Sequence, residues 1–169
     1  MGLTPMEGLV MGTRSGDIDP GIITFLQEKE NWNAQEVEDF LNKKSGLSGL
    51  SGLGNDMRDI IKKAENGNED ARIAIQVFTH RITKYIGAYA AVMNGVDVLV
   101  FTAGIGENSA EIRNRVCQGL DFLGIRIDEF KNASAKLSVE NDVVNIADEN
   151  ARVKVLAIKT DEQLAIALE

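Results

Sequence analysis

The sequence lacks several residue types on which common classes of protein depend. It contains one cysteine, Cys117, and one histidine, His80. An internal disulfide is therefore excluded, and there is no second thiol to build a zinc site with the histidine. No apolar run approaches the roughly 20 residues needed to cross a bilayer, and the first residues show no signal-peptide pattern. We therefore expect a cytoplasmic protein with no membrane partner.

Positive charge is also scarce. The 169-residue chain carries 18 Lys and Arg residues against 26 Asp and Glu residues, which gives a formal net charge of −8 at pH 7. Nucleic-acid binding draws mainly on clustered Lys and Arg, so we expect no nucleic-acid partner. A small anion is compatible with this charge, because one or two arginines are enough to bind it. The length and the 44% hydrophobic content predict one domain with a core of ordinary size.

Local capping patterns predict two helices early in the chain. Asp19 stands before a proline and is a natural N-cap, which predicts a helix over residues 20–29. Asn33 and Glu36 form a capping-box pattern for a second helix over residues 34–43. Both patterns supply a side-chain acceptor where the first backbone N–H groups of a helix need one.

A glycine-rich repeat follows, and then two helical patterns. The stretch SGLSGLSGL, residues 45–53, writes one triplet three times. It is too short for a solenoid repeat and predicts a glycine-rich loop. NDMRDIIKKAE starts a helix at about Asp56, and a long helix from Glu69 to Met93 is apolar on most sides, as expected of a helix at the centre of a domain. We expect His80, which lies on this helix away from any motif, to be buried or partly buried.

The rest of the sequence alternates strands with helices. We predict strands over residues 98–102, 125–127, 143–146 and 153–158, a helix over 109–123 and another starting near Asp161. This alternation indicates an α/β fold. Ligands of open α/β sheets bind beyond the carboxyl ends of the strands, which directs attention to the loop after the first predicted strand.

That loop carries two closely spaced glycines, in DVLVFTAGIGENSAEIR, residues 97–113. Gly104 and Gly106 would let the backbone approach a phosphate closely or adopt a positive φ. No lysine follows them, so the loop is not a P-loop. A plain tight turn, with Asn108 and Glu111 as a capping box for the next helix, explains the same residues.

A dinucleotide-binding unit is a second functional interpretation of this loop. Residues 104–109 read GxGxxS and precede a helix and a strand that ends in Asp128, which could bind a ribose hydroxyl. The third glycine is missing, however, and Glu107 would place a carboxylate close to a pyrophosphate. Spacing alone leaves hydride transfer with NAD and the binding of ATP equally open.

Two arginines stand in positions that suit ligand binding. Arg14 lies among small residues in the glycine-flanked loop GTRSGDIDPG, although an ion pair with Asp17 or Asp19 would also explain it. Arg58 stands in the first turn of a helix, where its charge opposes the helix dipole at a cost of roughly 0.3–1 kcal/mol. A residue kept against a local preference invites a functional interpretation, but a pair with Asp56 would account for it too.

Four stretches of the sequence together resemble the acetokinase family. They are MEGLVMGTRSGDIDPG, SGLSGLGNDMRDI, VFTAGIGENSAEIR and TDEQL; they occur in the family's order and cover nearly the whole chain. The resemblance is to the C-terminal part of acetate kinases. It implies an incomplete ribonuclease-H-like α/β domain, similar to those of sugar kinases, actin and heat-shock ATPases, with a mixed sheet and flanking helices. It also implies reversible, Mg²⁺-dependent phosphoryl transfer from ATP to acetate, giving acetyl phosphate and ADP, with propionate or butyrate kinase as the alternative.

The resemblance implies roles for particular residues. Arg14 would stabilise the transferring phosphoryl group. Glu162 matches the family's magnesium carboxylate, although stabilisation of the first turn of a helix explains Glu162 equally well. The contacts to ATP or ADP would come from Asp56, Met57, Arg58, Gly104, Ile105, Gly106, Glu107 and Asn108. The glycine turn would thus hold ATP rather than NAD.

The resemblance also implies what this sequence does not contain. The family's N-terminal domain, with its phosphate loops, acetate-site arginine, catalytic aspartate and catalytic histidine, finds no match, and the family usually continues beyond TDEQL. We therefore expect part of a homodimeric enzyme, inactive alone, whose substrate is a short-chain carboxylate. A non-catalytic module for nucleotide binding or dimerisation is the alternative.

Overall fold

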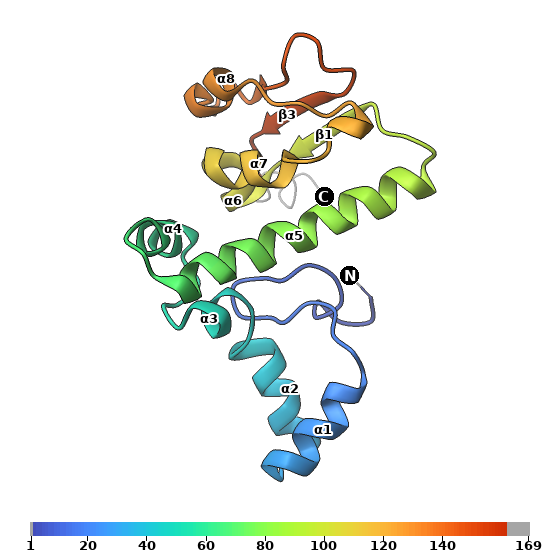
Figure 1. Ribbon diagram of the computed structural model, residues 1–169, viewed down its shortest axis with the longest axis vertical. Helices are drawn as coiled ribbons and strands as arrows, with labels where there is room; N and C mark the ends of the chain where they lie inside the picture. The colour runs from blue at the N-terminus through green and yellow to red at the C-terminus, as the bar shows by residue number, and fades with distance from the viewer. Residues whose placement is uncertain (1, 162–169) are drawn as a thin grey trace. The chain divides into compact units, whose positions relative to one another are not determined.

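The computed structural model of this chain describes residues 2–161, which divide into two compact units. The first unit ends at Ile82 and the second begins at Thr83, so the long helix α5 (Glu69–Val92) contributes residues to both (Figure 1). Within the described residues, no helix combines the length and the hydropathy needed to cross a bilayer.

Helices make up the regular structure of the first unit. They are α1 (Gly21–Glu30), α2 (Ala34–Lys43), α3 (Gly46–Ser51), α4 (Met57–Glu65) and the first part of α5. The capping box of α2 is confirmed, because the Glu36 amide donates to Asn33 Oδ1 at 3.1 Å and the Asn33 amide donates to Glu36 Oε2 at 2.7 Å. The core comprises Val10, Val37, Leu41, Leu47, Met57, Ile60, Ala71, Ala74, Ile75 and Phe78.

The glycine-rich repeat is not a loop as predicted, because residues 46–51 form helix α3. Leu47 is fully buried and anchors this short helix in the core of the unit. Gly46 has a φ of +63°, and a Cβ at this position would overlap the Met11 carbonyl oxygen and lie 2.8 Å from the Arg14 carbonyl oxygen. The first and last glycines of the repeat therefore serve different purposes, since Gly46 admits a neighbouring backbone whereas Gly52 ends the helix at a φ of +65°.

Helix α5 buries one face and exposes another, so the prediction of a helix buried on nearly all sides is wrong. Ala74 and Ile75 are buried, whereas Ile73 and Val77 are exposed. His80 is also exposed, which corrects the prediction of a buried or partly buried histidine. The physical reason is the helical spacing, since residues 73, 77 and 80 share one face of the helix.

The second unit contains a three-stranded sheet in the order β1-β3-β2. Strand β1 (Val98–Phe101) is parallel to β3 (Lys154–Ile158), and β2 (Val143–Asn145) is antiparallel to β3. Val155 and Ala157 of the central strand are fully buried. The α/β fold class, with a mixed sheet and flanking helices, is thereby confirmed. The register places Val100 of β1 opposite Leu156, and Val144 of β2 opposite Ala157.

Residues 125–127, predicted as a strand, form only an isolated β-bridge at Ile127. The next residue, Asp128, accepts a hydrogen bond from the Lys131 amide at 2.9 Å and begins helix α8 (Glu129–Ser134). The strand prediction is wrong because this cap turns the extended segment into a helix after one bridging residue.

The helix predicted over residues 109–123 is also interrupted. The segment after β1 forms α6 (Ala103–Asn108), then α7 (Ala110–Cys117), and a single 3₁₀ turn, η1 (Asp121–Leu123), follows. Gly119, with a φ of +79°, separates α7 from η1. Sequence periodicity continued across this break because Val116 and Leu120, four residues apart on either side of Gly119, are both buried.

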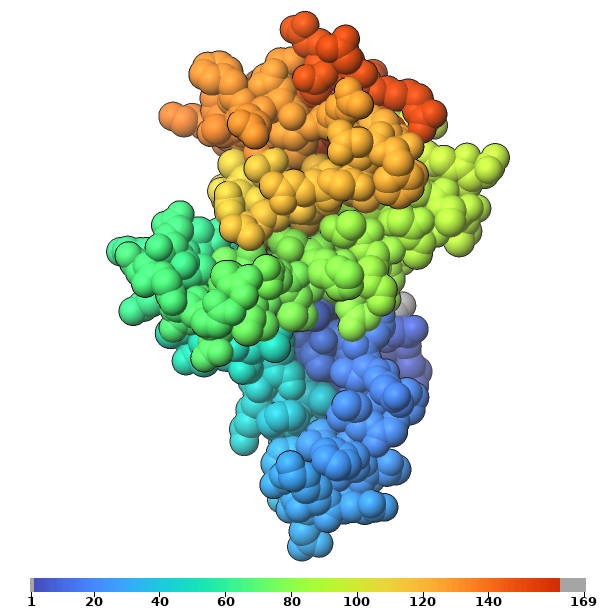
Figure 2. Space-filling model, viewed as in Figure 1, coloured from blue at the N-terminus to red at the C-terminus, as the bar shows by residue number. Residues whose placement is uncertain are grey.

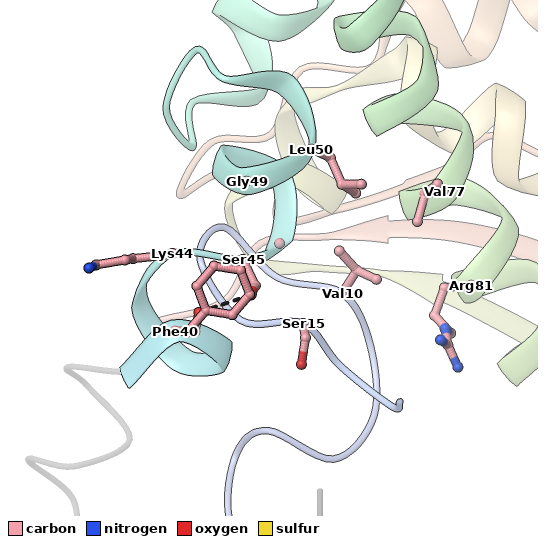
Figure 3. A pocket seen from close by; sticks show the side chains of 10 residues that line it. Val10, Ser15, Phe40, Lys44, Ser45, Gly49, Leu50, Val77 and Arg81 are labelled. Carbon is pink, nitrogen blue, oxygen red and sulfur yellow. Dashed lines mark hydrogen bonds between the residues drawn. The ribbon is translucent and has the colours of Figure 1, made fainter. Parts of the chain in front are cut away.

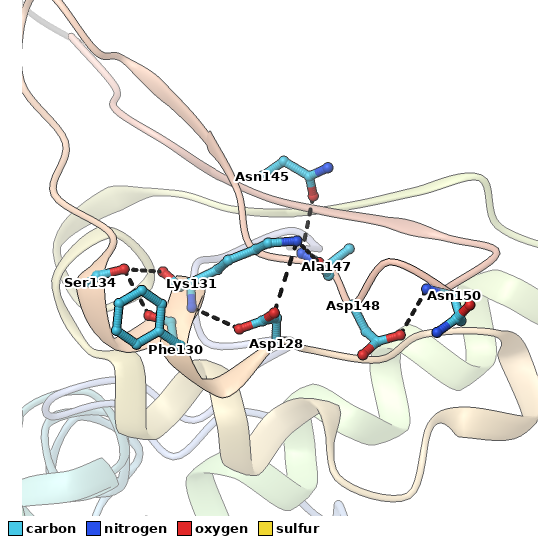
Figure 4. Close-up of polar contacts among 8 residues, drawn as sticks. All are labelled: Asp128, Phe130, Lys131, Ser134, Asn145, Ala147, Asp148 and Asn150. Atoms are coloured by element: carbon cyan, nitrogen blue, oxygen red, sulfur yellow. Dashed lines mark hydrogen bonds and ion pairs between the residues drawn. The ribbon is translucent and has the colours of Figure 1, made fainter.

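Helix α8 is fastened to the segment that follows β2 (Figure 4). The Lys131 ammonium donates to the Ala147 carbonyl at 3.4 Å and lies 3.9 Å from the Asp128 carboxylate. The Ala147 amide in turn donates to Asn145 Oδ1 at 3.0 Å. The residues from α8 to β3, coloured orange to red, form a continuous packed surface in Figure 2. α8 therefore has a fixed place in the second unit.

Candidate functional site

In the second unit, the carboxyl ends of β1 and β3 lie at the same edge of the sheet, because the two strands are parallel. Helix α6, which carries residues 104–108, starts two residues after β1, and Thr160 lies two residues after β3. This is the edge at which ligands of α/β sheets bind. The structure thus places the predicted glycine segment where the topology favours a ligand.

The glycines do not adopt the conformation that the sequence suggested. Neither Gly104 nor Gly106 has a positive φ, because both belong to α6; Ala103, just before them, has a φ of +58°. A Cβ at Gly106 would lie 3.3 Å from the Phe101 carbonyl carbon, so this glycine lets the helix pack closely against β1. A Cβ at Gly104 would meet no atom within 4 Å. Gly104 alone therefore presents open backbone, and Ile105 beside it is half-buried.

The Glu107 carboxylate is turned toward the end of β3. Its Oε1 accepts hydrogen bonds from the Thr160 hydroxyl at 2.7 Å and from the Thr160 amide at 2.9 Å. These bonds lower the pKa of Glu107. The Glu107 carboxylate, whose negative charge counted against a phosphate ligand at this loop, is therefore hydrogen-bonded to Thr160. These hydrogen bonds link α6 to the residues that follow β3.

The predicted capping box of Asn108 and Glu111 is wrong. Ser109 is the N-cap of α7 and accepts from the Ile112 amide at 3.3 Å. The Asn108 side chain instead donates to the Gly104 carbonyl at 2.8 Å, and Glu111 forms an ion pair with Arg115. Asn108 thus stabilises α6 itself, because its side chain donates back to a carbonyl of the same helix.

Arg113, which the sequence analysis did not single out, lies beneath this segment with 1% of its surface exposed. Its Nη1 donates to the carbonyls of Gly106, at 2.9 Å, and Glu107, at 2.8 Å. Burial lowers the pKa of its guanidinium. One sequence signal could have identified Arg113. It stands directly after Ile112 in α7, among residues such as Val116 that are buried.

In the first unit, Arg14 is held by its backbone in the loop before α1. The Met11 amide donates to the Arg14 carbonyl at 3.1 Å, and Arg14 Nη1 lies 3.8 Å from the Met11 sulfur. Its Nε is buried and has no hydrogen-bond partner among residues 2–161, where Arg14 also forms no ion pair. The simple explanation by a pair with Asp17 or Asp19 does not apply, since Asp17 binds Arg81 and the Asp19 carboxylate accepts from the Gly21 amide. Asp19 is not the N-cap that the sequence predicted, because α1 begins at Gly21 with Pro20 in that position.

Asp56 and Arg58 form a closed pair at the start of α4. Asp56 is the N-cap and accepts from the Arg58 amide at 2.9 Å, while the Arg58 guanidinium donates to both carboxylate oxygens, at 3.0 and 2.6 Å. The side-chain hydrogen bond from Arg58 lowers the pKa of Asp56 to about 2. The Arg58 side chain is 89% exposed. The local pair therefore accounts for an arginine in this turn, and its exposure leaves it accessible to a ligand.

Met57 differs from its two neighbours, because it is buried in the core of the first unit. Only its backbone can contact a ligand. The loop of Arg14 lies against the segment that leads into α4, since a Cβ at Gly12 would lie 3.0 Å from Asn55 Cβ. The structure therefore brings the Arg14 loop and the start of α4 together within the first unit.

The remaining predicted site residue, Glu162, lies outside the described residues. Among residues 2–161 there is no group of three or more His, Cys, Asp or Glu side chains that could hold a metal ion. The magnesium carboxylate therefore stays a prediction.

A separate cavity of about 300 Å³ lies in the first unit (Figure 3). It is lined by Val10, Ser15, Phe40, Lys44, Ser45, Gly46, Gly49, Leu50, Val77 and Arg81. Val10, Leu50 and Val77 face one another, and the Lys44 ammonium points away from them (Figure 3). None of the predicted site residues within the described range 2–161 lines this cavity, although Ser15 follows Arg14 directly.

Comparison with known proteins gives one consistent result. A model of the acetokinase family matches residues 1–168. The chain is 52% identical over 169 residues to an acetate kinase of Desulfitobacterium hafniense. Among solved structures, it is similar to the acetate kinase of Porphyromonas gingivalis, with a TM-score of 0.93 at 46% identity, and to a propionate kinase of Francisella tularensis, with a TM-score of 0.88 at 43% identity. Both structural matches cover 99% of this chain.

The chain spans about 41% of the length of the relatives that it matches, in sequence and in structure. The similarity covers the chain from end to end and includes every predicted site residue. The covered share does not itself locate the match within the relatives, so the assignment to their C-terminal part stays a prediction.

Proposed function

Because this chain belongs to the acetokinase family, we propose that it supplies part of the active site of a kinase that phosphorylates acetate. The reaction transfers a phosphoryl group reversibly from ATP to the carboxylate and yields acetyl phosphate and ADP. Support comes from the relatives, which are named acetate kinases and are about half identical to this chain over its whole length. The substrate class is accordingly a small carboxylate.

The observation that carries this proposal is the state of Arg14. Its guanidinium forms no ion pair within residues 2–161, and the neighbouring aspartates are engaged by Arg81 and by the start of α1. Phosphoryl transfer depends on positioning and on the neutralisation of charge, and it requires no protein nucleophile. An arginine held by its backbone in a glycine-flanked loop, with no carboxylate attached to it, suits the stabilisation of a phosphoryl group.

We assign nucleotide binding to two sets of residues, one in each unit. In the second unit, residues 104–108 stand at the carboxyl edge of β1 and β3, and the open backbone at Gly104 favours close approach of a phosphate or a ribose. In the first unit, Arg58 is exposed and Asp56 holds it in place. Met57 would contribute its backbone alone, since its side chain is buried.

Glu162 is assigned to Mg²⁺, which in such enzymes neutralises charge on the phosphates. Mg²⁺ is commonly held by one or two carboxylates together with phosphate oxygens and water, so the lack of a carboxylate cluster among the described residues is compatible with this assignment. What the described residues contribute is therefore the cationic Arg14 and the nucleotide-binding segments.

Propionate is the second candidate acceptor, because one similar structure is that of a propionate kinase. One extra methylene in an apolar pocket changes discrimination by only about 10–200-fold. Acetate and propionate kinases can therefore share the same fold and the same nucleotide site.

The test of this proposal is a chimaera in which this chain replaces the matching 41% of the Desulfitobacterium hafniense relative. Acetyl phosphate formed from ATP and acetate is trapped as the hydroxamate and measured by colour, with propionate and butyrate assayed in parallel. We expect turnover that depends on ATP and Mg²⁺, with kcat/KM highest for acetate. A folded chimaera without ATP-dependent turnover on any of the three acids would contradict the proposed function.

We further propose that the complete protein is a homodimer in the cytoplasm, as the family resemblance implies. Helix α1 exposes Ile22, Ile23 and Phe25, which is the kind of apolar surface that another chain covers. Sedimentation equilibrium of the chimaera tests the assembly, and a monomer at high concentration would contradict it.

A further inference from the structure

Arg113 is the only charged side chain that is buried among the described residues, and it forms no ion pair with any of them. Burying a charge without a partner is costly, and buried arginines are normally neutralised by a carboxylate. Here neutral oxygen atoms accept all the hydrogen bonds of the guanidinium. This arrangement needs an explanation beyond the filling of a core, because an apolar side chain among Ile112, Val116 and Cys117 would avoid the cost.

The guanidinium connects two separate pieces of the second unit. On one side, Nε donates to Asn132 Oδ1 at 2.7 Å and Nη2 donates to the Asn132 carbonyl at 3.0 Å. On the other side, Nη1 donates to the carbonyls of Gly106 and Glu107, at 2.9 and 2.8 Å. These two carbonyls belong to the last turn of α6, where unpaired C=O groups carry a partial negative charge. The arginine therefore supplies donors and a complementary charge at that point.

Asn132 is a fixed anchor for this connection. Its Nδ2 donates to the Ala110 carbonyl at 2.9 Å, and it is itself buried. The helix that carries it, α8, is held by the Lys131 contacts with Asp128 and Ala147 (Figure 4). A continuous set of hydrogen bonds thus runs from the segment after β2, through α8 and Arg113, to the backbone of α6.

Glu107 is held through both its backbone and its side chain. Its carbonyl accepts from Arg113, and its carboxylate accepts from Thr160 beyond β3. Gly106 packs against Phe101 of β1. The segment 104–108 is consequently held by Arg113, by Thr160 and by its packing on β1, while no other atom lies close to the backbone at Gly104 on the side where a Cβ would stand.

We propose that Arg113 is a positioning residue for the nucleotide: through the Gly106 and Glu107 carbonyls it holds residues 104–108 in the conformation that binds ATP. This role rests on the function proposed above. Arg113 is buried under the segment, so it acts on the nucleotide through the backbone of α6 and not by touching it. A lysine carries its three donors on a single nitrogen and cannot reach Asn132, Gly106 and Glu107 together, whereas the guanidinium spreads its donors over three nitrogens.

The experiment compares Arg113→Gln, Arg113→Lys and Asn132→Ala in the chimaera, with separate KM values for ATP and acetate. A displaced binding segment costs on the order of tenfold to a hundredfold. We expect the KM for ATP to rise by that factor in Arg113→Gln and Asn132→Ala. We expect the KM for acetate to stay within about twofold, because the loss of a contact that serves only ATP changes the KM for ATP and leaves the KM for acetate nearly unchanged. Arg113→Lys should recover only part of the effect.

Arg115→Gln is the matched control, since Arg115 lies on the same helix and pairs with Glu111 at the surface. Hydrogen exchange of the 169-residue chain gives a measurement that does not depend on turnover. Exchange at residues 104–108 should be on the order of tenfold faster in Arg113→Lys, with α5 unchanged.

The outcomes separate the two proposals. An active chimaera whose variants lose thermal stability but keep the wild-type KM for ATP shows that Arg113 is structural only and overturns this inference. Equal changes in both KM values overturn it as well. A folded wild-type chimaera without turnover overturns the proposed function and, with it, the role of Arg113 in positioning a nucleotide. If Arg113→Gln does not fold, the KM for ATP of Asn132→Ala decides the question. That substitution removes the side-chain acceptor of Arg113 Nε and keeps the guanidinium charge.

Discussion

At the scale of single residues, the candidate site is defined by how each charge is paired. Arg14 has no carboxylate partner within residues 2–161, Arg58 is closed onto Asp56, and Glu107 is engaged by Thr160. Only the first of these leaves a cation without a counterion. The sequence placed all of these residues in glycine-flanked loops or at helix starts, but it did not tell which of the charges were paired.

Arg14→Ala in the chimaera should lower kcat on the order of a thousandfold, by analogy with other arginines that stabilise a transferring phosphoryl group. The hydroxamate assay at saturating ATP and acetate measures it. Arg72→Ala is the control, because Arg72 is an exposed arginine of the same unit that pairs with Glu69. Near-full turnover of Arg14→Ala would show that the assigned role is wrong.

The pair of Asp56 and Arg58 makes a prediction about pH. The pKa of Asp56 is lowered from 3.8 to about 2. A group with a depressed pKa stabilises the folded state above its unfolded pKa, and this contribution is lost as the pH falls through the folded value. We therefore expect the stability difference between wild type and Asp56→Asn to be constant from neutral pH down to about 4 and to vanish toward about 2.

Asn keeps an acceptor at the N-cap of α4, so Asp56→Asn isolates the charge of the carboxylate. Urea unfolding at a series of pH values measures the difference. Asp59→Asn controls for the loss of a negative charge from the same helical turn, because Asp59 has no ion pair among residues 2–161. A difference that persisted unchanged at pH 2 would contradict the assignment of the shift to the Arg58 pair.

At the scale of secondary-structure elements, a short helix replaces a predicted loop or turn in each of the two units. α3 forms from a glycine-rich repeat because Leu47 is buried, and α6 forms from the glycine turn because Gly106 packs against β1. In each case burial or close packing in the fold offsets a weak helical propensity. The glycines then serve close packing, which sequence spacing alone could not distinguish from ligand binding.

The repeat offers a matched pair of substitutions. Gly46→Ala and Gly52→Ala both place a side chain at a positive φ, at +63° and +65°, which costs about 1–2 kcal/mol. At Gly46 the new Cβ also overlaps the Met11 carbonyl, whereas at Gly52 it meets no atom within 4 Å. We expect Gly46→Ala to be more destabilising by a further ~1–3 kcal/mol in urea unfolding. Equal losses would contradict the close packing of α3 on the Arg14 loop.

At the scale of the whole molecule, each unit carries its own part of the assignment. The first holds Arg14 and the start of α4, and the second holds α6 at the carboxyl edge of the parallel strands. The chain spans about 41% of its relatives. The family resemblance assigns an acetate-site arginine, a catalytic aspartate and a catalytic histidine to sequence that this chain does not match.

We therefore expect the 169-residue chain to form no acetyl phosphate by itself. We also expect it to bind ADP with Mg²⁺ more weakly after Arg58→Ala, because Arg58 is exposed and held at the start of α4. The hydroxamate assay measures the first and calorimetric titration the second, with Arg72→Ala as the control. Steady turnover by the pure chain contradicts the first expectation, and unchanged ADP binding in Arg58→Ala contradicts the second.

The sequence by itself determined the features that depend on neighbouring residues. The capping box of Asn33 and Glu36 and the start of a helix at about Asp56 were predicted because the side-chain and backbone groups that decide them lie within three residues. The apolar runs that became β1 and β3 were predicted as well, and with them the α/β class. The four motifs were sufficient to indicate the family.

Only the tertiary structure decided the features that depend on distant partners. Arg113 reads as an ordinary arginine of an amphipathic helix until Asn132, 19 residues later, is placed beside it. The engagement of Glu107 depends on Thr160, 53 residues away, and the freedom of Arg14 depends on Arg81 having bound Asp17. Local pattern cannot specify such pairs, because which charge meets which partner is set by chain topology and burial.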